Sequence, residues 1–221
     1  MGHDTLTKAG IFSATLLTLM LSNTAFAVEP NSSSAESSST KHSETVVAPY
    51  LREDAPTFNL TVAQFREKFN TTYPHMVLAE YKTIKTLEVK SPLIRAASRI
   101  NNTLYSSVAI DKSQRTIRSL QLTYLPPPPS EEKQEKPENI AKAEKAARTV
   151  LANYIAAFIS LFEPTSTLEK CQNKANELLE KGKGSPFYQQ KEGTLRFVIA
   201  DHNEKGITFA IEPIKLSLSD K

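Results

Sequence analysis

Apolar residues recur every three or four positions after Thr61, which is the spacing of one face of a helix. Thr61 and Gln64 also have the spacing of a capping box, in which each side chain bonds the backbone N–H group of the other residue. Phe65 and Phe69 then fall on one face, four positions apart. The pattern predicts a helix that begins after Thr61 and ends before Pro74, because proline does not continue a helix.

Two further helices are predicted in the second half of the chain. The longer covers residues 139–162 and is apolar on nearly every side in its C-terminal half, which favours a central core helix over one lying on a membrane surface. The next begins with a second capping box formed by Ser166 and Glu169. It has Cys171 on its apolar face, as a small core residue, and ends with Gly182 at the C′ position.

The stretch after Ser91 fits a helix or a strand. Ser91 and Pro92 suit an N-cap and the first helical position, and Ile94, Ala97 and Ile100 repeat every three residues. We predict a short helix here, with a strand as the alternative.

Alternating apolar and polar residues predict a first β-hairpin, with strands at 104–110 and 116–125. Ile117 is out of phase with Leu120 and the apolar positions that follow it. An extra residue in one strand shifts the alternation in this way, so we expect a β-bulge near Arg118 and Ser119.

A second β-hairpin is predicted near the C-terminus, with strands at 195–200 and 207–211 around a polar turn. The two hairpins are expected to combine into one antiparallel sheet of about four strands, with the helices packed against its apolar face. The predicted fold is therefore a single α+β domain. Whether the two hairpins lie next to each other in the sheet is left open.

The N-terminus has the three parts of a secretory signal. Lys8 precedes a short apolar run at 9–21, and Ala25 and Ala27 supply the small residues that signal peptidase recognises. The run is too short to span a membrane. We predict a signal peptide over residues 1–27 that is cleaved after Ala27.

Residues 28–47 are rich in Ser and poor in apolar residues, so we predict a disordered linker there and the folded domain over 48–221. Four consecutive prolines begin an exposed Pro-rich loop at 126–137. The single cysteine, Cys171, is far from the signal, so no thiol stands there to carry a lipid. The protein is expected to be free in the periplasm of a Gram-negative bacterium, with no membrane anchor after cleavage.

Composition and motifs argue against three kinds of function: nucleic-acid binding, metal binding and catalysis by a Ser-His-Asp triad. The net charge is only +3, and the basic residues are spread along the chain among acidic ones, whereas a nucleic-acid-binding protein concentrates them. The four histidines form no cluster with metal-ligand spacing, so no metal and no cofactor are expected. Asp201 and His202 are adjacent, but they lie in a turn whose residue types explain their presence, and no G-x-S-x-G nucleophile motif accompanies them.

One polar cluster stands out at the junction before the first hairpin. Its members, which could present convergent donors to an anion or a peptide backbone, are Arg95, Arg99, Asn101, Asn102 and Tyr105. Helix capping and strand pairing are the alternative explanation for the same residues.

Several short stretches distributed over the predicted domain are similar to stretches of a known protein family. They are Ala48-Pro49-Tyr50-Leu51, Ala55-Pro56-Thr57-Phe58, Arg95-Ala96-Ala97-Ser98 and Glu204-Lys205-Gly206-Ile207-Thr208-Phe209-Ala210. In these the chain resembles the YiiQ-like exported proteins of enterobacteria, a family of unknown function. The resemblance implies a periplasmic location, says nothing about activity, and transfers no functional residues.

The sequence therefore favours a non-enzymatic binding or interaction module of the cell envelope, whose partner is an envelope protein or a small ligand and not a nucleic acid. The alternative is a hydrolase acting on envelope material, which would use Asp201, His202 or Glu212 in a cleft.

Overall fold

Seven strands form one antiparallel sheet in the computed structural model of the chain, which describes residues 48–85, 91–127 and 137–215. In spatial order the strands are β1 (Lys82–Ile84), β2 (Leu93–Arg99), β3 (Leu104–Asp111), β4 (Ile117–Tyr124), β7 (Ile207–Pro213), β6 (Leu195–Asp201) and β5 (Tyr188–Glu192). The described residues all belong to one compact unit, Thr45–Lys221. The predicted signal peptide and linker lie outside them, as does most of the predicted Pro-rich loop. The α+β class is confirmed, but the sheet has seven strands where about four were expected.

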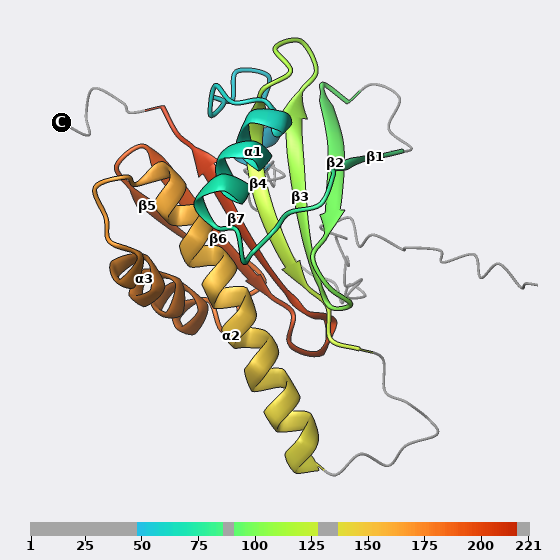
Figure 1. The fold of residues 1–221 in the computed structure, drawn as a ribbon. Coiled ribbons are helices and arrows are strands. Elements are labelled where there is room, and N and C mark those ends of the chain that lie inside the picture. Colours follow the sequence, from blue (N-terminus) through green and yellow to red (C-terminus); the bar gives the residue numbers. More distant parts are fainter. Residues whose placement is uncertain (1–47, 86–90, 128–136, 216–221) are drawn as a thin grey trace, which may run out of the picture. The chain divides into compact units, whose positions relative to one another are not determined.

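The α-helices of the described residues lie on one face of this sheet (Figure 1). They are α1 (Val62–Thr72), α2 (Pro137–Phe162) and α3 (Leu168–Lys181), and two short 3-10 helices cover Pro49–Leu51 and Asn203–Lys205. The capping box of α1 is present as predicted: Gln64 N donates to Thr61 Oγ1 (3.3 Å) and Thr61 N to Gln64 Oε1 (2.9 Å).

Both ends of α3 differ in detail from the prediction. Its N-cap is Thr167, whose hydroxyl accepts from Lys170 N (3.3 Å), so the cap lies one residue later than the expected Ser166. Gly182 follows the helix in a right-handed conformation, not the left-handed one of a C′ glycine. A Cβ at this position would collide with the side chain of Ile199, so glycine is required there for close approach to β6.

The predicted helix after Ser91 is wrong, because this stretch is β2. It pairs with β3 along its whole length, from Leu93 opposite Asp111 to Arg99 opposite Tyr105. Ala96 is buried in the core on the helix side of the sheet, whereas the three-residue repeat that suggested a helix combines residues from both faces of a strand. Pairing over seven residues outweighed a weak local preference for helix.

The edge strands β1 and β5 were not predicted. Their sequences, Lys-Thr-Ile and Tyr-Gln-Gln-Lys-Glu, are short and contain few apolar residues. A strand at the edge of a sheet is only partly buried, so it leaves a weak pattern of alternation in the sequence.

The β-bulge expected near Arg118 is confirmed. Ala109 pairs with Ser119, whereas the next residue of β3, Ile110, pairs with Ile117, so Arg118 is the extra residue of β4. Strict alternation with the core residues Leu120, Leu122 and Tyr124 would turn residue 118 toward the helices. The bulge instead places Ile117 in the core and frees Arg118 to point away from it.

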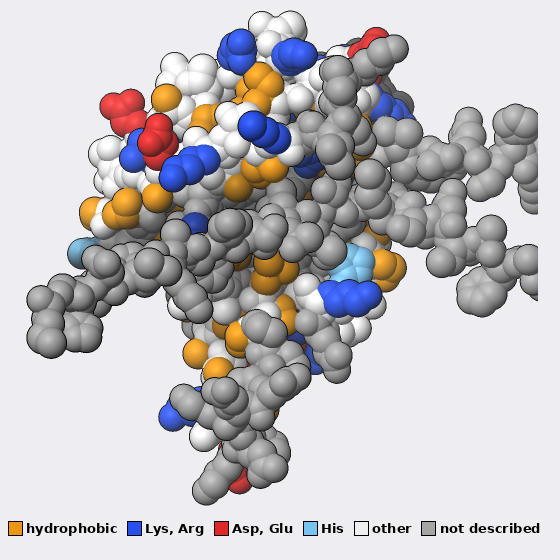
Figure 2. Space-filling model, turned by 90° about the vertical axis from the view of Figure 1, so that its right-hand side faces the viewer, with side chains coloured by type: hydrophobic (Ala, Val, Ile, Leu, Met, Phe, Trp, Pro, Cys, Tyr) orange, Lys and Arg blue, Asp and Glu red, His pale blue; other side chains and the backbone are white. Residues whose placement is uncertain are grey.

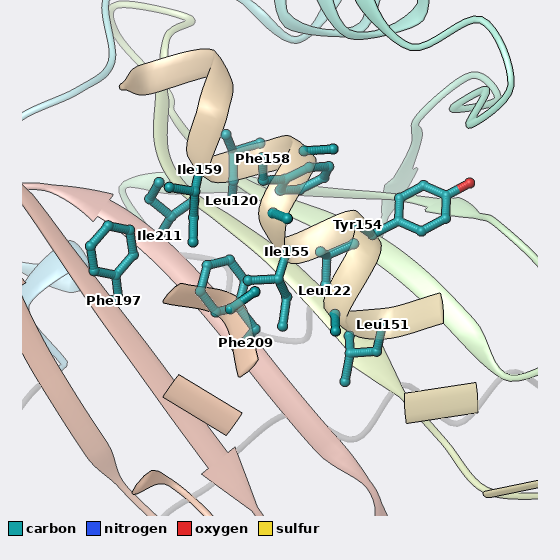
Figure 3. Close-up of a cluster of buried hydrophobic side chains, with 14 of the residues drawn as sticks. Leu120, Leu122, Leu151, Tyr154, Ile155, Phe158, Ile159, Phe197, Phe209 and Ile211 are labelled. Atoms are coloured by element: carbon teal, nitrogen blue, oxygen red, sulfur yellow. The ribbon is translucent and has the colours of Figure 1, made fainter. Parts of the chain in front are cut away.

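The core lies between the C-terminal half of α2 and the centre of the sheet (Figure 3). Ile155, Phe158 and Ile159 of the helix are fully buried against strand residues such as Leu120 and Phe209. This half of α2 is the central core helix that was predicted, and Cys171 of α3 is buried in the same cluster. The first turns of α2 continue past the end of the sheet and are exposed (Figure 1). Among the described residues no helix is long and apolar enough to cross a membrane.

The two hairpins lie next to each other in the sheet. β4 pairs with β7 from Leu120 opposite Ile211 to Tyr124 opposite Ile207. Each half of the chain therefore contributes helix and then antiparallel strands, and the last strands of the two halves meet at the centre of the sheet.

Candidate functional site

The face of the sheet that turns away from the helices carries lone charged residues in otherwise apolar strands. Leu195 and Phe197 of β6 belong to the core, so Arg196 between them points to the opposite face. For the same reason Glu212 of β7 points away from Ile211. A buried charge needs a partner, and each of these residues is the partner of the other.

Arg196 and Glu212 are directly opposite each other in the β6–β7 ladder. Arg196 donates from Nε to Glu212 Oε2 (3.0 Å) and also from Nη2, while the Ser119 hydroxyl donates to Oε1 (3.3 Å). Burial raises the pKa of Glu212, against the lowering effect of Arg196 and Ser119. Within the described part of the chain, Nη1 of Arg196 has no hydrogen-bond acceptor, although the guanidinium is held firmly from its other side.

The β-bulge supplies a second buried ion pair on this face. Arg118 donates from Nε to Asp111 Oδ2 (2.9 Å), and the other oxygen of Asp111 accepts from Ser113 N (2.8 Å), Ser113 Oγ (2.6 Å) and Gln114 N (2.8 Å). The hydrogen bond from the Ser113 hydroxyl, helped by that from Gln114 N and by Arg118, holds the pKa of Asp111 far below its usual range.

Arg118 also fastens the segment that precedes α1. Its Nη1 donates to the carbonyl of Arg52 (2.6 Å) and its Nη2 to that of Glu53 (3.0 Å). Two backbone bonds then lead the chain round the end of β4 into α1: Phe58 N to Ile117 O (2.8 Å) and Ile117 N to Leu60 O (2.9 Å). The bulge residue therefore sets the position of residues 49–56 over the open face of the sheet.

A hollow of about 440 Å³ lies between this segment and the ends of β5, β6 and β7. The residues that line it are Pro49, Tyr50, Arg52, Asp54, Ala55, Pro56, Arg118, Lys191, Glu192, Gly193, Arg196, Pro213, Ile214 and Lys215. Five of them are basic and two are acidic. One acidic residue, Asp54, pairs with Lys215 (3.3 Å), which lowers the pKa of Asp54. The other, Glu192, is bound by Lys174 of α3 (2.8 Å). Arg118, Arg196 and Lys215 each have an acidic partner, so Arg52 and Lys191 supply the excess of positive charge, since neither forms an ion pair with a described residue.

The side of the molecule beyond β1 also shows more Lys and Arg than Asp and Glu side chains among its coloured residues (Figure 2). The hollow differs from this side in that two of its lining residues, Arg118 and Arg196, are buried arginines fixed by ion pairs. Buried and fixed donors bind an anion with less loss of conformational entropy than exposed lysines do.

The structure brings most of the predicted polar cluster together, but in the β2–β3 turn. Arg99 donates to Asn101 O (3.1 Å) and to Asn102 Oδ1 (2.6 Å), and Tyr105 is its cross-strand neighbour. Asn101 Oδ1 accepts from the backbone N–H groups of residues 103 and 104 (2.8 Å each). Arg95 lies apart and donates to the hydroxyl of Tyr50 (3.1 Å), at the wall of the hollow.

The residues named for a hydrolase do not come together. Asp201 ends β6 opposite Ile207, whereas Glu212 lies at the other end of the hairpin opposite Arg196 and on the other face of the sheet. Asp201 accepts from Asn203 N (2.8 Å) and faces Arg148 of α2 (3.6 Å), so it holds the turn in which His202 lies. No group of three or more His, Cys, Asp and Glu side chains suited to a metal occurs among the residues that the structure describes.

Sequence reasoning missed the two arginines that form the base of the hollow. Part of the signal was present, because Arg196 is a single charge inside a predicted apolar strand and a bulge was expected near Arg118. Glu212, however, lies just after the predicted strand at 207–211, and the pairing register of the two strands was not predicted. A lone charge in a buried strand predicts an ion pair with its cross-strand neighbour. The segment 49–56, which completes the hollow, has no such signal.

Comparison with known proteins places the chain among proteins without an assigned activity. A family profile described as "Protein of unknown function (DUF1454)" matches residues 17–220. The "Uncharacterized protein YiiQ" of Escherichia coli (strain K12) is 43% identical over 173 residues, which cover 78% of this chain and 81% of that protein. No solved structure matches the chain.

Proposed function

This chain belongs to the DUF1454 family of proteins of unknown function, and we propose from its site that it is a non-enzymatic binding module of the bacterial cell envelope. In this proposal the hollow on the open face of the sheet holds an anionic group of the ligand. Carboxylate and phosphate share the chemistry that this site would recognise.

The observation that carries the proposal is the way Arg196 is held. Glu212 binds the Nε and Nη2 side of its guanidinium, Nη1 has no acceptor among the described residues, and Arg196 lines the same hollow as Lys191 and Lys215. Hydrogen bonds between a guanidinium and an anion are among the stronger ones in proteins, and a guanidinium already fixed in place loses little entropy on binding.

Binding is favoured over catalysis by the kinds of side chains in the hollow. General acid–base catalysis at neutral pH needs a group whose pKa lies near 7. The residues that line the hollow include no His and no Cys, and the pKa of Asp54 is lowered. The hydrolase alternative would need Asp201, His202 and Glu212 in one cleft, which their separation along the hairpin does not support.

The periplasm is proposed as the location on the basis of the N-terminal sequence. A charged residue, a short apolar run and the Ala25-Phe26-Ala27 end support export and cleavage, and the position of Cys171 gives no support for a lipid anchor. Fractionation of cells that express the full chain, followed by N-terminal sequencing of the product, tests both points.

The binding proposal is tested by NMR titration of the isotope-labelled protein with acetate and with inorganic phosphate at constant ionic strength. We expect saturable shifts of the Gly193 and Ile214 amide signals, with a dissociation constant in the millimolar range that is normal for so small a ligand. The double variant Arg196→Met/Glu212→Gln, which leaves no unpaired buried charge, should abolish saturation.

The matched control is Lys142→Met on the exposed first turns of α2. The same helix contacts the opposite end of β6 through Arg148, so this variant removes one positive charge far from the hollow. Shifts that increase linearly over the whole surface, or that persist in the double variant, would show that no anion site exists.

A further inference from the structure

We propose that an extended, acidic segment of another envelope protein docks on β5 as an additional strand and places two carboxylates at the mouth of the hollow. This inference rests on the proposed function and names its partner class. The argument comes from the free edge of β5, from its geometry relative to Arg196 and from the charge of the surrounding residues.

β5 is a regular strand with one free edge. Tyr188 to Glu192 pair with Ile199 to Leu195 of β6 without a register shift, and no described residue makes a backbone hydrogen bond to the other side of β5. The backbone N–H and C=O groups on that side are available to an incoming strand. At the opposite edge of the sheet β1 has only three residues, so β5 is the longer of the two edges.

β5 has few of the features with which proteins block an edge strand. It contains no proline and no bulge, and of its side chains on the open face, Gln189 and Lys191, only one is charged. Just before the strand, the side chain of Phe187 is 48% exposed. An exposed aromatic residue next to a free edge offers an apolar contact to a strand that pairs there.

The register of the sheet links this edge to the hollow. Lys191 is directly opposite Arg196, and both side chains lie on the open face. A residue of the incoming strand opposite Lys191 would have its Cβ about 5 Å away, and the next residue on the same face would lie about 7 Å further along, level with Gly193. Acidic side chains at two alternate positions would therefore meet Lys191 and the hollow.

The positive charge around β5 favours an acidic partner over a second copy of the chain. Two copies paired through β5 would bring two basic hollows close together, which is electrostatically unfavourable. A segment with two carboxylates would instead complement Lys191, Arg196 and Lys215.

The experiment uses the full chain and a synthetic peptide of about ten residues, the length of a long strand, with alternating Val and Thr and two Glu at alternate positions near one end. Binding is measured by calorimetry, and amide hydrogen exchange is followed residue by residue. We expect the exchange of edge-facing amides in Tyr188–Glu192 to slow by about tenfold or more at saturation.

Two matched peptides and two protein variants separate strand addition from anion binding. A peptide with the same sequence and alternate N-methylated amides keeps its charges but does not pair, so it should bind at least about tenfold more weakly and give no protection of β5. Replacement of both Glu by Gln should weaken binding at least about tenfold. Lys191→Met should weaken it about threefold to tenfold, whereas Lys142→Met should leave it unchanged.

Equal binding of the normal and N-methylated peptides would overturn docking on β5 while leaving the anion site intact. Concentration-dependent protection of β5 without peptide would show that a second copy is the occupant, which also overturns the proposal. If the acidic peptide, acetate and phosphate all fail to perturb the hollow, the proposed function itself is wrong.

Discussion

Asp111 and Arg118 show why a buried ion pair in this protein acts as a clamp. Removing two charges from water costs about as much as their attraction returns, so such a pair adds little net stability by itself. Its effect is local, because Arg118 can satisfy its remaining donors only through the carbonyl groups of Arg52 and Glu53. The pair therefore determines where the segment over the sheet is held.

Replacing Asp111 by Asn should reduce stability and change its pH dependence. At neutral pH the variant leaves Arg118 buried without a counter-charge, which costs about 3–5 kcal/mol. The folded-state pKa of Asp111 is lowered, so the unfolded chain binds the proton more readily. The stabilisation is complete above the unfolded pKa of about 3.9 and is lost as the pH falls toward the folded pKa.

Urea unfolding between neutral pH and about pH 3 measures this effect. The wild-type free energy of unfolding should fall over the acidic part of this range, and that of Asp111→Asn should fall less. Asp54→Asn is the control, because Asp54 is exposed and its pair with Lys215 contributes little. A fall of equal size in wild type and Asp111→Asn would contradict the role given to Asp111.

At the scale of elements, α1 shows how local sequence and tertiary contacts combine. Thr61 and Gln64 fix the start of the helix, and Phe65 and Phe69 then lie edge-on to Phe158 of α2, with ring centroids 5.3 and 5.4 Å away. The cap therefore determines the position of the aromatic residues that join α1 to the core.

Thr61→Ala should lower the free energy of unfolding by about 1 kcal/mol, because it removes the acceptor for Gln64 N and one partner of Gln64 Oε1. Thr72→Ala, in the exposed last turn of the same helix, should change it by less than about 0.5 kcal/mol. Chemical denaturation of both variants provides the comparison. A Thr61→Ala loss no larger than that of Thr72→Ala would mean that the cap contributes nothing.

The elements that could be predicted from sequence are those whose own residues carry the pattern. The capping box of α1, the long apolar helix and the two hairpins each have a pattern that is complete within a few positions. The prediction of β2 was wrong because the backbone hydrogen bonds that define this strand come from β3. In addition, Ser98 faces the core but is polar, since its hydroxyl donates to Ala79 O (2.9 Å), so it interrupts the apolar alternation. The edge strands β1 and β5 were not predicted because their side chains are mostly exposed, so their sequences lack the apolar alternation of a buried strand.

The candidate site was less predictable than the fold for a related reason. The bulge near Arg118 was predicted, but the contacts of the Arg118 side chain with residues 52 and 53 were not. Arg118 binds backbone carbonyl groups there, and because every residue type has one, the sequence does not mark these partners. Arg95 was noted for the β2–β3 junction, yet its contact is Tyr50, which lies 45 positions earlier. Contacts of this kind depend on the path of the chain and leave no motif.

At the scale of the whole molecule, stability depends on one layer of side chains between α2 and the sheet. Phe158→Ala should reduce the free energy of unfolding by about 3–5 kcal/mol, since Phe158 is fully buried and contacts α1 as well. Phe187→Ala removes the same ring from a half-exposed position and should cost less than about 1 kcal/mol. Thermal and chemical denaturation test the difference, and similar losses would contradict the assignment of the core.

The meeting of β4 and β7 at the centre of the sheet has a consequence for the order of folding. Tyr124 pairs with Ile207, 83 positions later, so the centre of the sheet is complete only when the last strand, β7, has joined β4. Contacts so distant in sequence pay a large loop-closure entropy before they return any stability, which makes folding slow. A fold completed by so distant a pairing keeps the chain unfolded for longer than one built from neighbouring contacts, and an unfolded chain is the form that the proposed export through a membrane would require.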